Sequence, residues 1–229
     1  MSDSKNQELV LVVDFGAQYA QLIARRVRQA QVYSEIVPSS MAISKMLEKK
    51  PTAIILSGGP SSVYEAGAPT LDPKIFEAGI PIFGICYGFQ VMAAALGGVV
   101  TQTGKSEFGR TALSHNANSK LLAGLPEEFS IWMSHGDSVT TAPAGFTSTA
   151  STADTAIVAF ENSDAQFAGV QFHPEVLHSE NGQEILRRWL IDIVGCKPVW
   201  NSENIVSTEV EKIRALVGSG RVLCGLSGG

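Results

Sequence analysis

A single cysteine, Cys86, lies between two glycines in the segment from Gly84 to Gln90, where an apolar run gives way to a helical pattern. A sharp turn from strand to helix exposes one side chain at the edge of a sheet, and glycines relieve crowding around it. The free N–H groups and the dipole at the start of the helix favour a thiolate. A lone cysteine is most often a buried core residue, but this setting favours a nucleophile.

A cysteine nucleophile needs a base, and the chain has four histidines. We interpret the surroundings of three of them as a surface turn, a turn after a strand and a solvated loop: His115, His135 and His178. His173 follows the apolar run 168–172, and Pro174 favours an extended conformation at His173. Side chains two residues apart on an extended chain point to the same side, so Glu175 can orient the imidazole and stabilise its cation. A hydrogen-bonded histidine at a strand end is the alternative, and the carboxylate partner favours the catalytic role.

An oxyanion formed by attack on a carbonyl group needs two converging N–H donors. The N–H group of Tyr87, directly after the nucleophile, is the first expected donor. The second should come from the Ser57-Gly-Gly-Pro60 loop at the end of another buried strand, and Gly59 is the residue expected to supply it. An ordinary tight turn or a phosphate loop are the alternatives, but the Lys-Ser/Thr pair of a Walker motif is absent.

The elements that must position these residues alternate over the first 100 residues between short apolar runs and segments with a helical period. Apolar runs without alternation are typical of buried parallel strands. The expected strands are 9–13, 36–37, 53–56 and 80–85, and the expected helices are 18–29, 41–49, 72–78 and 88–96. This order predicts an α/β fold, a flavodoxin-like and largely parallel mixed sheet with helices on both faces.

The middle of the chain, residues 99–172, loses the helical period and contains short β-rich pieces instead. The expected strands are 131–133, 147–150, 156–160 and 167–172. Asn162-Ser-Asp164 is a hairpin-type turn between the last two. These pieces predict added antiparallel strands that extend or flank the parallel sheet, and residues 181–193 predict an amphipathic helix that packs back onto it.

Residues 197–202 have the composition of a linker between a first domain, 1–196, and a short remainder, 203–229. In the remainder, a helix is expected at 203–217, capped by Ser202, and a strand is expected to begin at 222–226. A segment of this length cannot bury a core of its own. We therefore expect it to be the truncated start of a second domain.

The overall composition, 45% hydrophobic and 17% charged, is that of a globular protein. The formal net charge is −5 and no basic run occurs, so a nucleic-acid partner is not expected. No apolar run approaches the ~18 residues of a membrane span, and residues 1–8 lack the apolar centre of a signal peptide. Three cysteines without a CxxC pair predict free thiols, no metal site and a cytoplasmic location.

With these residues in place, the chain resembles the class I (triad) glutamine amidotransferases. The Gly-x-Cys-x-Gly-x-Gln elbow and the later Phe-His-Pro-Glu of that family match residues 84–90 and 172–175. The resemblance implies that four further residues help to hold the amino and carboxylate groups of a bound glutamine: Gln90, Ser134, His135 and Asp137. From residue type alone, His135 and Asp137 are equally well explained as turn formers.

The resemblance is greatest to members in which a linker leads from the glutaminase domain into an ATP-pyrophosphatase, or synthetase, domain. The segments that carry it are 14–19, 25–26, 107–109 and 132–137. The phosphate loop of that second domain reads Ser-Gly-Gly-x-Asp-Ser, and its opening matches Ser227, Gly228 and Gly229. The resemblance implies no cofactor for the glutaminase reaction, ATP and magnesium for the synthetase domain alone, and a homodimer for the full-length enzyme.

The implied reaction is hydrolysis of L-glutamine to L-glutamate and ammonia through a γ-glutamyl thioester. In the full-length enzyme the ammonia would pass to an activated nucleotide in the synthetase domain. Two alternatives stay open at this point. One is a γ-glutamyl hydrolase or cysteine peptidase on the same scaffold, and the other is a non-catalytic regulatory module, which would have no need of Cys86, His173 and Glu175 together.

Overall fold

Five parallel strands form one half of a single sheet in the computed structural model, which describes residues 8–16, 18–223 and 225. They are β1 (Leu9–Asp14), β2 (Tyr33–Pro38), β3 (Ala53–Leu56), β4 (Ile82–Ile85) and β9 (Phe167–Val170). Their order in the sheet is β2-β1-β3-β4-β9. This is the flavodoxin-like order with β9 as the fifth strand, so the predicted fold class is confirmed.

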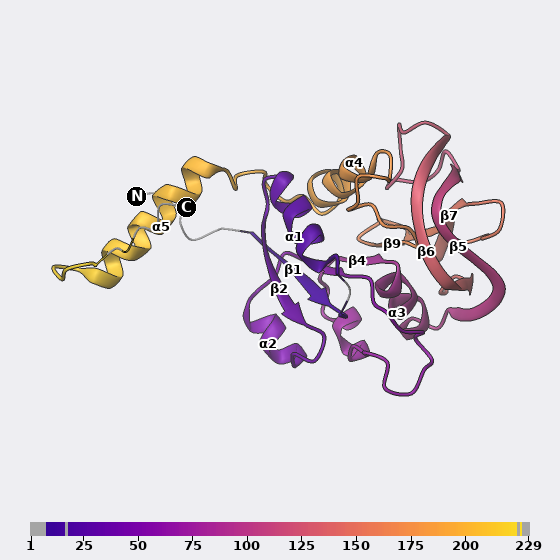
Figure 1. The fold of residues 1–229 in the computed structure, drawn as a ribbon, viewed down its shortest axis with the longest axis horizontal. Coiled ribbons are helices and arrows are strands. Elements are labelled where there is room, and N and C mark those ends of the chain that lie inside the picture. The colour runs from indigo at the N-terminus through magenta and orange to yellow at the C-terminus, as the bar shows by residue number, and fades with distance from the viewer. Residues whose placement is uncertain (1–7, 17, 224, 226–229) are drawn as a thin grey trace.

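Both faces of this parallel half are covered, because successive residues of each strand belong to two separate cores. Val10 and Val12 of β1 pack with α1 (Ala20–Gln29), α4 (Gly182–Arg187) and the π-helical turn η2 (Arg188–Ile193). Leu11 and Val13 pack with α2 (Ile43–Glu48), the 3-10 helix η1 (Pro73–Glu77) and α3 (Tyr87–Ala95). Figure 1 shows α1 and α4 on one side of the sheet and α2 and α3 on the other.

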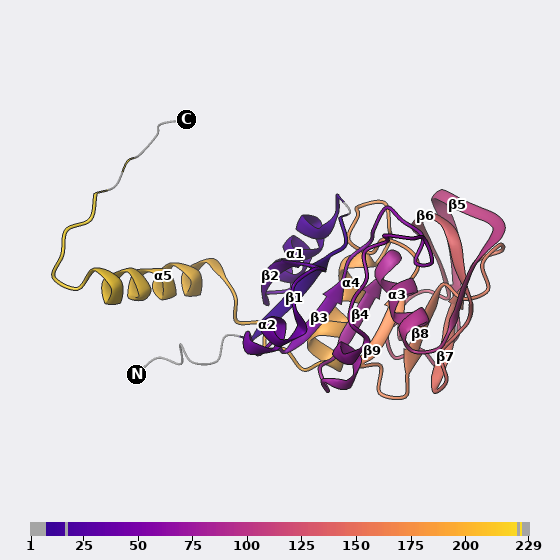
Figure 2. The ribbon, with the colours of Figure 1, turned by 90° about the horizontal axis from the view of Figure 1, so that it is seen from below.

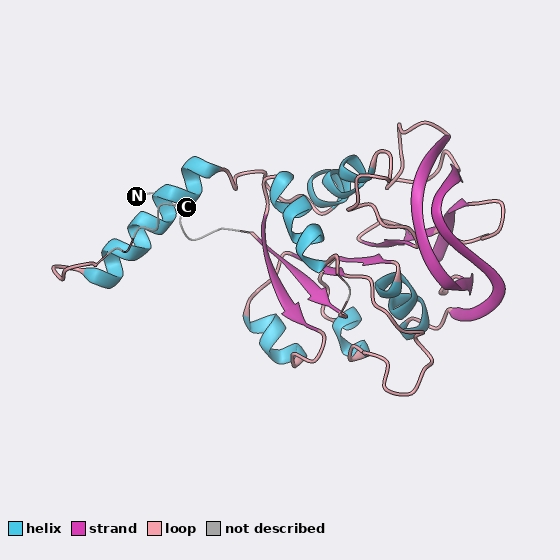
Figure 3. Ribbon diagram, viewed as in Figure 1, coloured by secondary structure: helices cyan, strands magenta, loops and turns pink. Residues whose placement is uncertain are grey.

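Four antiparallel strands continue the sheet beyond β9. They are β8 (Ala159–Asn162), β7 (Phe146–Ser151), β5 (Val99–His115) and β6 (Glu128–Thr141), in that order. β9 therefore pairs with β4 in parallel and with β8 in antiparallel orientation. The predicted antiparallel extension is confirmed, and the curved ribbon of β5 and β6 closes its outer end (Figure 3).

Two details of the β structure differ from the sequence-based predictions. β5 was not predicted at all, because that strand is polar and largely exposed and is stabilised by its backbone pairing with β6 rather than by an apolar face. The strand expected from residue 222 is also wrong at its start. Residues 221–223, which the structure does describe, have no regular secondary structure.

The linker lies against the outer strand of the parallel half through one aromatic residue, Trp200. Its backbone N–H group donates a hydrogen bond to the carbonyl oxygen of Gln31 at 2.7 Å, and the guanidinium carbon of Arg28 lies 5.8 Å from its ring centre. Beyond it, α5 (Ser202–Val217) extends away from the sheet domain (Figure 2), close to the helix expected at 203–217. Several of its apolar side chains are exposed, including Val206, Ile213 and Leu216.

Candidate active site

The strand-to-helix turn between β4 and α3 is built around Cys86. This residue has a φ of 51°, in the left-handed region that non-glycine residues rarely adopt. The two flanking glycines allow the backbone segments to pack closely. A Cβ atom on Gly84 would lie 2.7 Å from the Cα atom of Phe89, and one on Gly88 would lie 2.4 Å from the carbonyl oxygen of Leu56. The expected sharp turn at Cys86 is confirmed.

We expect Gly88→Ala to destabilise the fold by about 1–3 kcal/mol or more, because the added methyl group meets the backbone of Leu56 and overpacks the contact between β3 and α3. Urea unfolding followed by circular dichroism measures this change. Gly136→Ala is the matched control, since its Cβ atom would meet only Ser106 Oγ, at 3.7 Å. Equal midpoints for the two variants would contradict the packing account.

His173 and Glu175 lie just beyond β9, the strand that neighbours β4. Nδ1 of His173 is 2.8 Å from Oε1 of Glu175, and both side chains are buried. The backbone of His173 is fixed by two hydrogen bonds, one from its N–H group to the carbonyl oxygen of Trp132 at 3.0 Å and one from Ser179 Oγ to its carbonyl oxygen at 2.6 Å. The imidazole therefore has one defined orientation.

The electrostatics of His173 connect it to the cysteine as well as to the carboxylate. Burial by itself lowers the pKa of His173, but hydrogen bonds with Cys86 and Glu175, together with the charges of both groups, outweigh it and raise the pKa above its ordinary value. The structure thus brings together the thiol, the imidazole and the carboxylate. An imidazolium beside a thiolate is the active form of many cysteine nucleophiles.

Two residues of α1 and its N-terminal boundary hold this group from outside. Arg26 Nε donates to the backbone carbonyl oxygen of Glu175 at 2.7 Å, and the ring of Tyr19 contacts His173 edge-on at 5.3 Å between centroids. The Glu175 side chain is fully buried, and its Oε2 atom has no hydrogen-bond partner among the described residues. The carboxylate is therefore committed to His173.

The two residues expected to form an oxyanion hole are in contact. A Cβ atom on Gly59 would lie 2.8 Å from Cγ of Tyr87, so the loop after β3 packs directly on the aromatic ring of the residue after the nucleophile. The Tyr87 hydroxyl donates to the carbonyl oxygen of Pro69 at 2.7 Å. Ser57, fully buried, accepts from the N–H group of Phe15 at 3.1 Å and fixes the start of this loop.

Three of the four residues expected at the substrate lie around Cys86 and β6. The Cys86 thiol donates to the backbone carbonyl oxygen of Ser134 at 3.7 Å. Gln90 Nε2 donates to the backbone carbonyl oxygen of Asp137 at 2.9 Å. Asp137 Oδ1 accepts a hydrogen bond of 2.6 Å from the hydroxyl of Tyr64, an exposed residue that sequence reasoning missed.

His135 is placed differently from the expectation. The local sequence predicts a turn after a strand, but His135 lies within β6 and pairs with Glu107 of β5. Its side chain is buried, with Nδ1 2.9 Å from the carbonyl oxygen of Asp137 and Nε2 3.2 Å from Oε2 of Glu107. Glu107 also accepts from Thr152 and Thr155. Both ring nitrogens of His135 therefore have partners within the protein, on the side of the strand away from Ser134.

A second residue that sequence reasoning missed is Gln171, which is fully buried beside the cysteine. Its Nε2 atom donates to Cys86 Sγ at 3.8 Å. A signal was available in the sequence, because Gln171 precedes His173 by two residues and therefore points to the same side of an extended chain.

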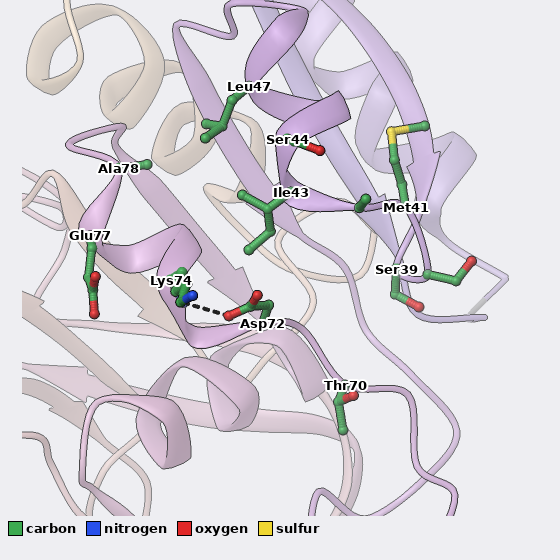
Figure 4. A pocket seen from close by; sticks show the side chains of 12 residues that line it. Ser39, Met41, Ile43, Ser44, Leu47, Thr70, Asp72, Lys74, Glu77 and Ala78 are labelled. Atoms are coloured by element: carbon green, nitrogen blue, oxygen red, sulfur yellow. Dashed lines mark hydrogen bonds between the residues drawn. The ribbon is translucent and has the colours of Figure 1, made fainter.

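A hollow of about 750 Å³ lies elsewhere, between α2 and η1 (Figure 4). Residues 39–47 and 70–78 contribute its lining, and Asp72 there caps η1 by accepting from the N–H group of Lys74 at 3.0 Å. None of the residues that surround Cys86 lines this hollow. Across residues 8–16, 18–223 and 225, no three side chains of the metal-ligating types are grouped to hold an ion, and no helix is long and apolar enough to cross a membrane.

An activated thiol at the carboxyl edge of a doubly wound sheet, with an imidazole and a buried carboxylate on the next strand, places the chain in the class of α/β enzymes with a cysteine nucleophile. Within that class the chain belongs to the class I glutamine amidotransferase family. The sequence model of that family, described as "Glutamine amidotransferase class-I", matches residues 11–193. The match includes both β4 and β9 and therefore the whole candidate site.

Individual relatives agree with this family. The chain is 58% identical over 222 residues to a GMP synthase [glutamine-hydrolyzing] from Thermobifida fusca, covering 97% of this chain and 42% of the relative. It thus spans about two fifths of the length of that curated relative. A solved GMP synthase subunit from Thermoplasma acidophilum is 30% identical, with a TM-score of 0.74 over 90% of this chain and 98% of that one. A glutamine amidotransferase from Thermotoga maritima, 18% identical with a TM-score of 0.66 over 83% of this chain and 100% of that one, shares the fold.

Proposed function

We propose that this chain hydrolyses L-glutamine to L-glutamate and ammonia, with Cys86 as nucleophile, His173 as acid and base, and Glu175 as the group that orients His173. The observation that carries the proposal is the position of His173, which interacts with both Cys86 and Glu175 at the ends of two neighbouring strands. Membership of the glutamine amidotransferase family supports glutamine as the substrate.

The first half of the reaction forms a thioester. The Cys86 thiolate attacks the side-chain amide carbon of glutamine, and the negative charge moves to the amide oxygen. His173, protonated by the thiol, gives its proton to the amide nitrogen as the C–N bond breaks and ammonia leaves. The product at this stage is a γ-glutamyl thioester on Cys86.

The second half releases glutamate. Neutral His173 removes a proton from a water molecule, whose oxygen attacks the thioester carbon. When the C–S bond breaks, the sulfur leaves as the thiolate beside protonated His173, and glutamate carries the new oxygen. The Glu175 carboxylate stabilises the imidazolium in both halves and keeps Nδ1 as the nitrogen that faces it.

The N–H groups of Gly59 and Tyr87 are proposed to stabilise the oxyanion in both halves. Contact between the Gly59 backbone and the Tyr87 ring supports this role, because it holds the loop after β3 against the start of α3. Neither contribution requires a side chain on Gly59, and the ring of Tyr87 leaves no space for one.

Gly59→Ala is expected to lower kcat for glutamine by ~10²–10³-fold, the cost of losing one oxyanion donor, because the added methyl group would lie 2.8 Å from Cγ of Tyr87 and displace the loop. Steady-state kinetics measures the effect, and alkylation of Cys86 by iodoacetamide, which needs no oxyanion hole, should continue. A variant with unchanged kcat would remove Gly59 from the proposed hole.

The amino and carboxylate groups of the glutamine are proposed to contact Gln90, Ser134 and Asp137, which lie on α3 and β6 near the cysteine. His135 is proposed to support this region indirectly. Its contact with the carbonyl oxygen of Asp137 fixes the backbone of β6, and its other ring nitrogen is engaged by Glu107.

The ammonia is proposed to aminate xanthosine monophosphate to GMP in a longer protein, as the relatives named GMP synthase suggest. Residues 1–196 would form the glutaminase domain, 197–202 the linker and 203–229 the start of the synthetase domain, which would bind ATP and magnesium. The exposed apolar side chains of α5, among them Val206 and Ile213, support a covering partner domain. The proposed phosphate-loop residues Ser227, Gly228 and Gly229 lie outside the described residues.

Two features of the full-length protein are proposed from similarity and chemistry alone. It would be a homodimer, as the family resemblance implies. It would act in the cytoplasm, where the free thiols of Cys86 and Cys196 would stay reduced.

The deciding experiment measures ammonia release from glutamine by this chain, alone and with the synthetase part of a relative added. Glutamine turnover that rises when the partner is added supports the proposal. Faster turnover of γ-glutamyl peptides than of free glutamine would instead indicate a γ-glutamyl hydrolase or peptidase. No turnover under either condition, with an unreactive Cys86, would indicate a regulatory module.

A further inference from the structure

We propose that Gln171 is a positioning residue for the nucleophile, which orients the Cys86 sulfur and favours its negatively charged form. This inference rests on the proposed role of Cys86. Gln171 follows the last residue of β9, and its side chain is fully buried although it is polar. A buried amide is costly unless its hydrogen-bonding groups have partners, so the partners of Gln171 indicate what it does.

The main chain around Gln171 is fixed on both sides. The N–H group of Gln171 donates to the carbonyl oxygen of Val158 at 2.7 Å, and the carbonyl oxygen of Val170 accepts from the N–H group of Cys86 at 2.9 Å. The cysteine and the glutamine therefore occupy matching positions at the ends of β4 and β9. The side-chain Nε2 atom of Gln171 then reaches Cys86 Sγ at 3.8 Å.

The orientation of the Gln171 amide follows from a chain of hydrogen bonds. The carbonyl oxygen of Asp137 can only accept, so the atom of Gln90 that faces it at 2.9 Å must be the NH₂ group. The same NH₂ group faces Oε1 of Gln171 at 3.1 Å. Since the Gln171 oxygen is engaged there, its NH₂ group is the end that faces the sulfur.

The other neighbour of the sulfur shows why this donor matters. The carbonyl oxygen of Ser134, 3.7 Å from Cys86 Sγ, can accept from a neutral thiol but repels a thiolate. A hydrogen-bond donor favours the charged form of its partner, and an acceptor disfavours it. Gln171 offsets the Ser134 carbonyl, and together with His173 it gives the sulfur two interactions that favour the thiolate.

The test uses the full chain with Gln171→Met, which keeps the length of the side chain and removes the amide. The rate of Cys86 alkylation by iodoacetamide is followed by mass spectrometry of the Cys86 peptide from about pH 5 to about pH 10, without glutamine. We expect the midpoint of this profile to rise by about one pH unit and kcat for glutamine to fall about tenfold, with KM within about twofold of wild type. A change in packing alone would not move the alkylation midpoint.

Two further variants keep the result interpretable. Gln21→Met, on the exposed side of α1, is the matched control and should leave the profile unchanged. If Gln171→Met does not fold, Gln90→Met removes the anchor of the Gln171 oxygen and should raise the midpoint by a smaller amount.

An alkylation midpoint within a few tenths of a unit of wild type, in a folded variant, would overturn the proposal. Failure of the proposed function would look different. A wild-type chain that is alkylated at Cys86 but releases no ammonia from glutamine would refute glutaminase activity and leave the alkylation test of Gln171 intact.

Discussion

Cys86→Ala is expected to lower glutamine hydrolysis by ~10⁴-fold or more, because no other group near His173 can form the thioester. The variant should also lose covalent labelling by an electrophilic glutamine analogue. Ammonia release and intact-protein mass spectrometry measure the two effects. The side chain that replaces Cys86 is smaller and sits on an already strained backbone, so urea unfolding should accompany the assays.

Cys196→Ala is the matched control for this experiment. Cys196 is also buried, but it lies after η2, and burial raises the pKa of its thiol to about 12. It should be unreactive, and its replacement should leave glutamine turnover unchanged. Turnover or analogue labelling that persists in Cys86→Ala would remove Cys86 as the nucleophile.

Glu175→Gln is expected to lower kcat by ~10³–10⁴-fold while the fold is retained, because a neutral amide cannot stabilise the imidazolium and can select the wrong tautomer of His173. The negative charge of Glu175 is one of the causes that raise the pKa of His173. The variant should therefore have a lower His173 pKa, which NMR titration of the ring protons measures.

The shift has a consequence for stability whose sign is fixed. The folded chain holds the His173 proton more tightly than the unfolded chain, in which the pKa is about 6.5. The raised pKa therefore contributes stability fully below about pH 6.5, and this contribution is lost as the pH rises through the folded-state pKa. In Glu175→Gln the loss should occur at lower pH, which urea unfolding at a series of pH values will measure.

Glu161→Gln is the control for replacing a buried carboxylate. Glu161 lies on β8 and accepts from Ser119 and from the N–H groups of Lys120 and Leu121. Its replacement should affect stability but leave the pKa of His173 unchanged. If Glu175→Gln also leaves that pKa and kcat unchanged, the orienting role of Glu175 is wrong.

The sequence predicted the parts of the site that depend on short spacing. Gly84, Cys86 and Gly88 imply a sharp turn because steric crowding is a local property, and the structure has that turn. The positions of His173 and Glu175 on one side of an extended segment follow from a two-residue period in the same way. The parallel strands were equally accessible, because most of them are apolar without interruption.

The parts that were missed depend on contacts between distant segments. β5 carries no periodic apolar signal, and its length becomes apparent only when β6 is paired with it. The same pairing places His135 within a strand and against Glu107, where the local sequence indicates a turn. Gln171 has a local signal, but its partners, Gln90 and Cys86, come from another part of the chain.

The adjacency of β4 and β9 has a kinetic consequence. Cys86 and Gln171 are separated by 85 residues in the chain, and the strands β5, β6, β7 and β8 all lie within that interval. Pairings of such long sequence separation form slowly, since a large loop must close before the contact is made. The reactive thiol environment is therefore assembled among the last contacts of folding, and Cys86 stays without its imidazole partner in any nascent chain that ends before β9.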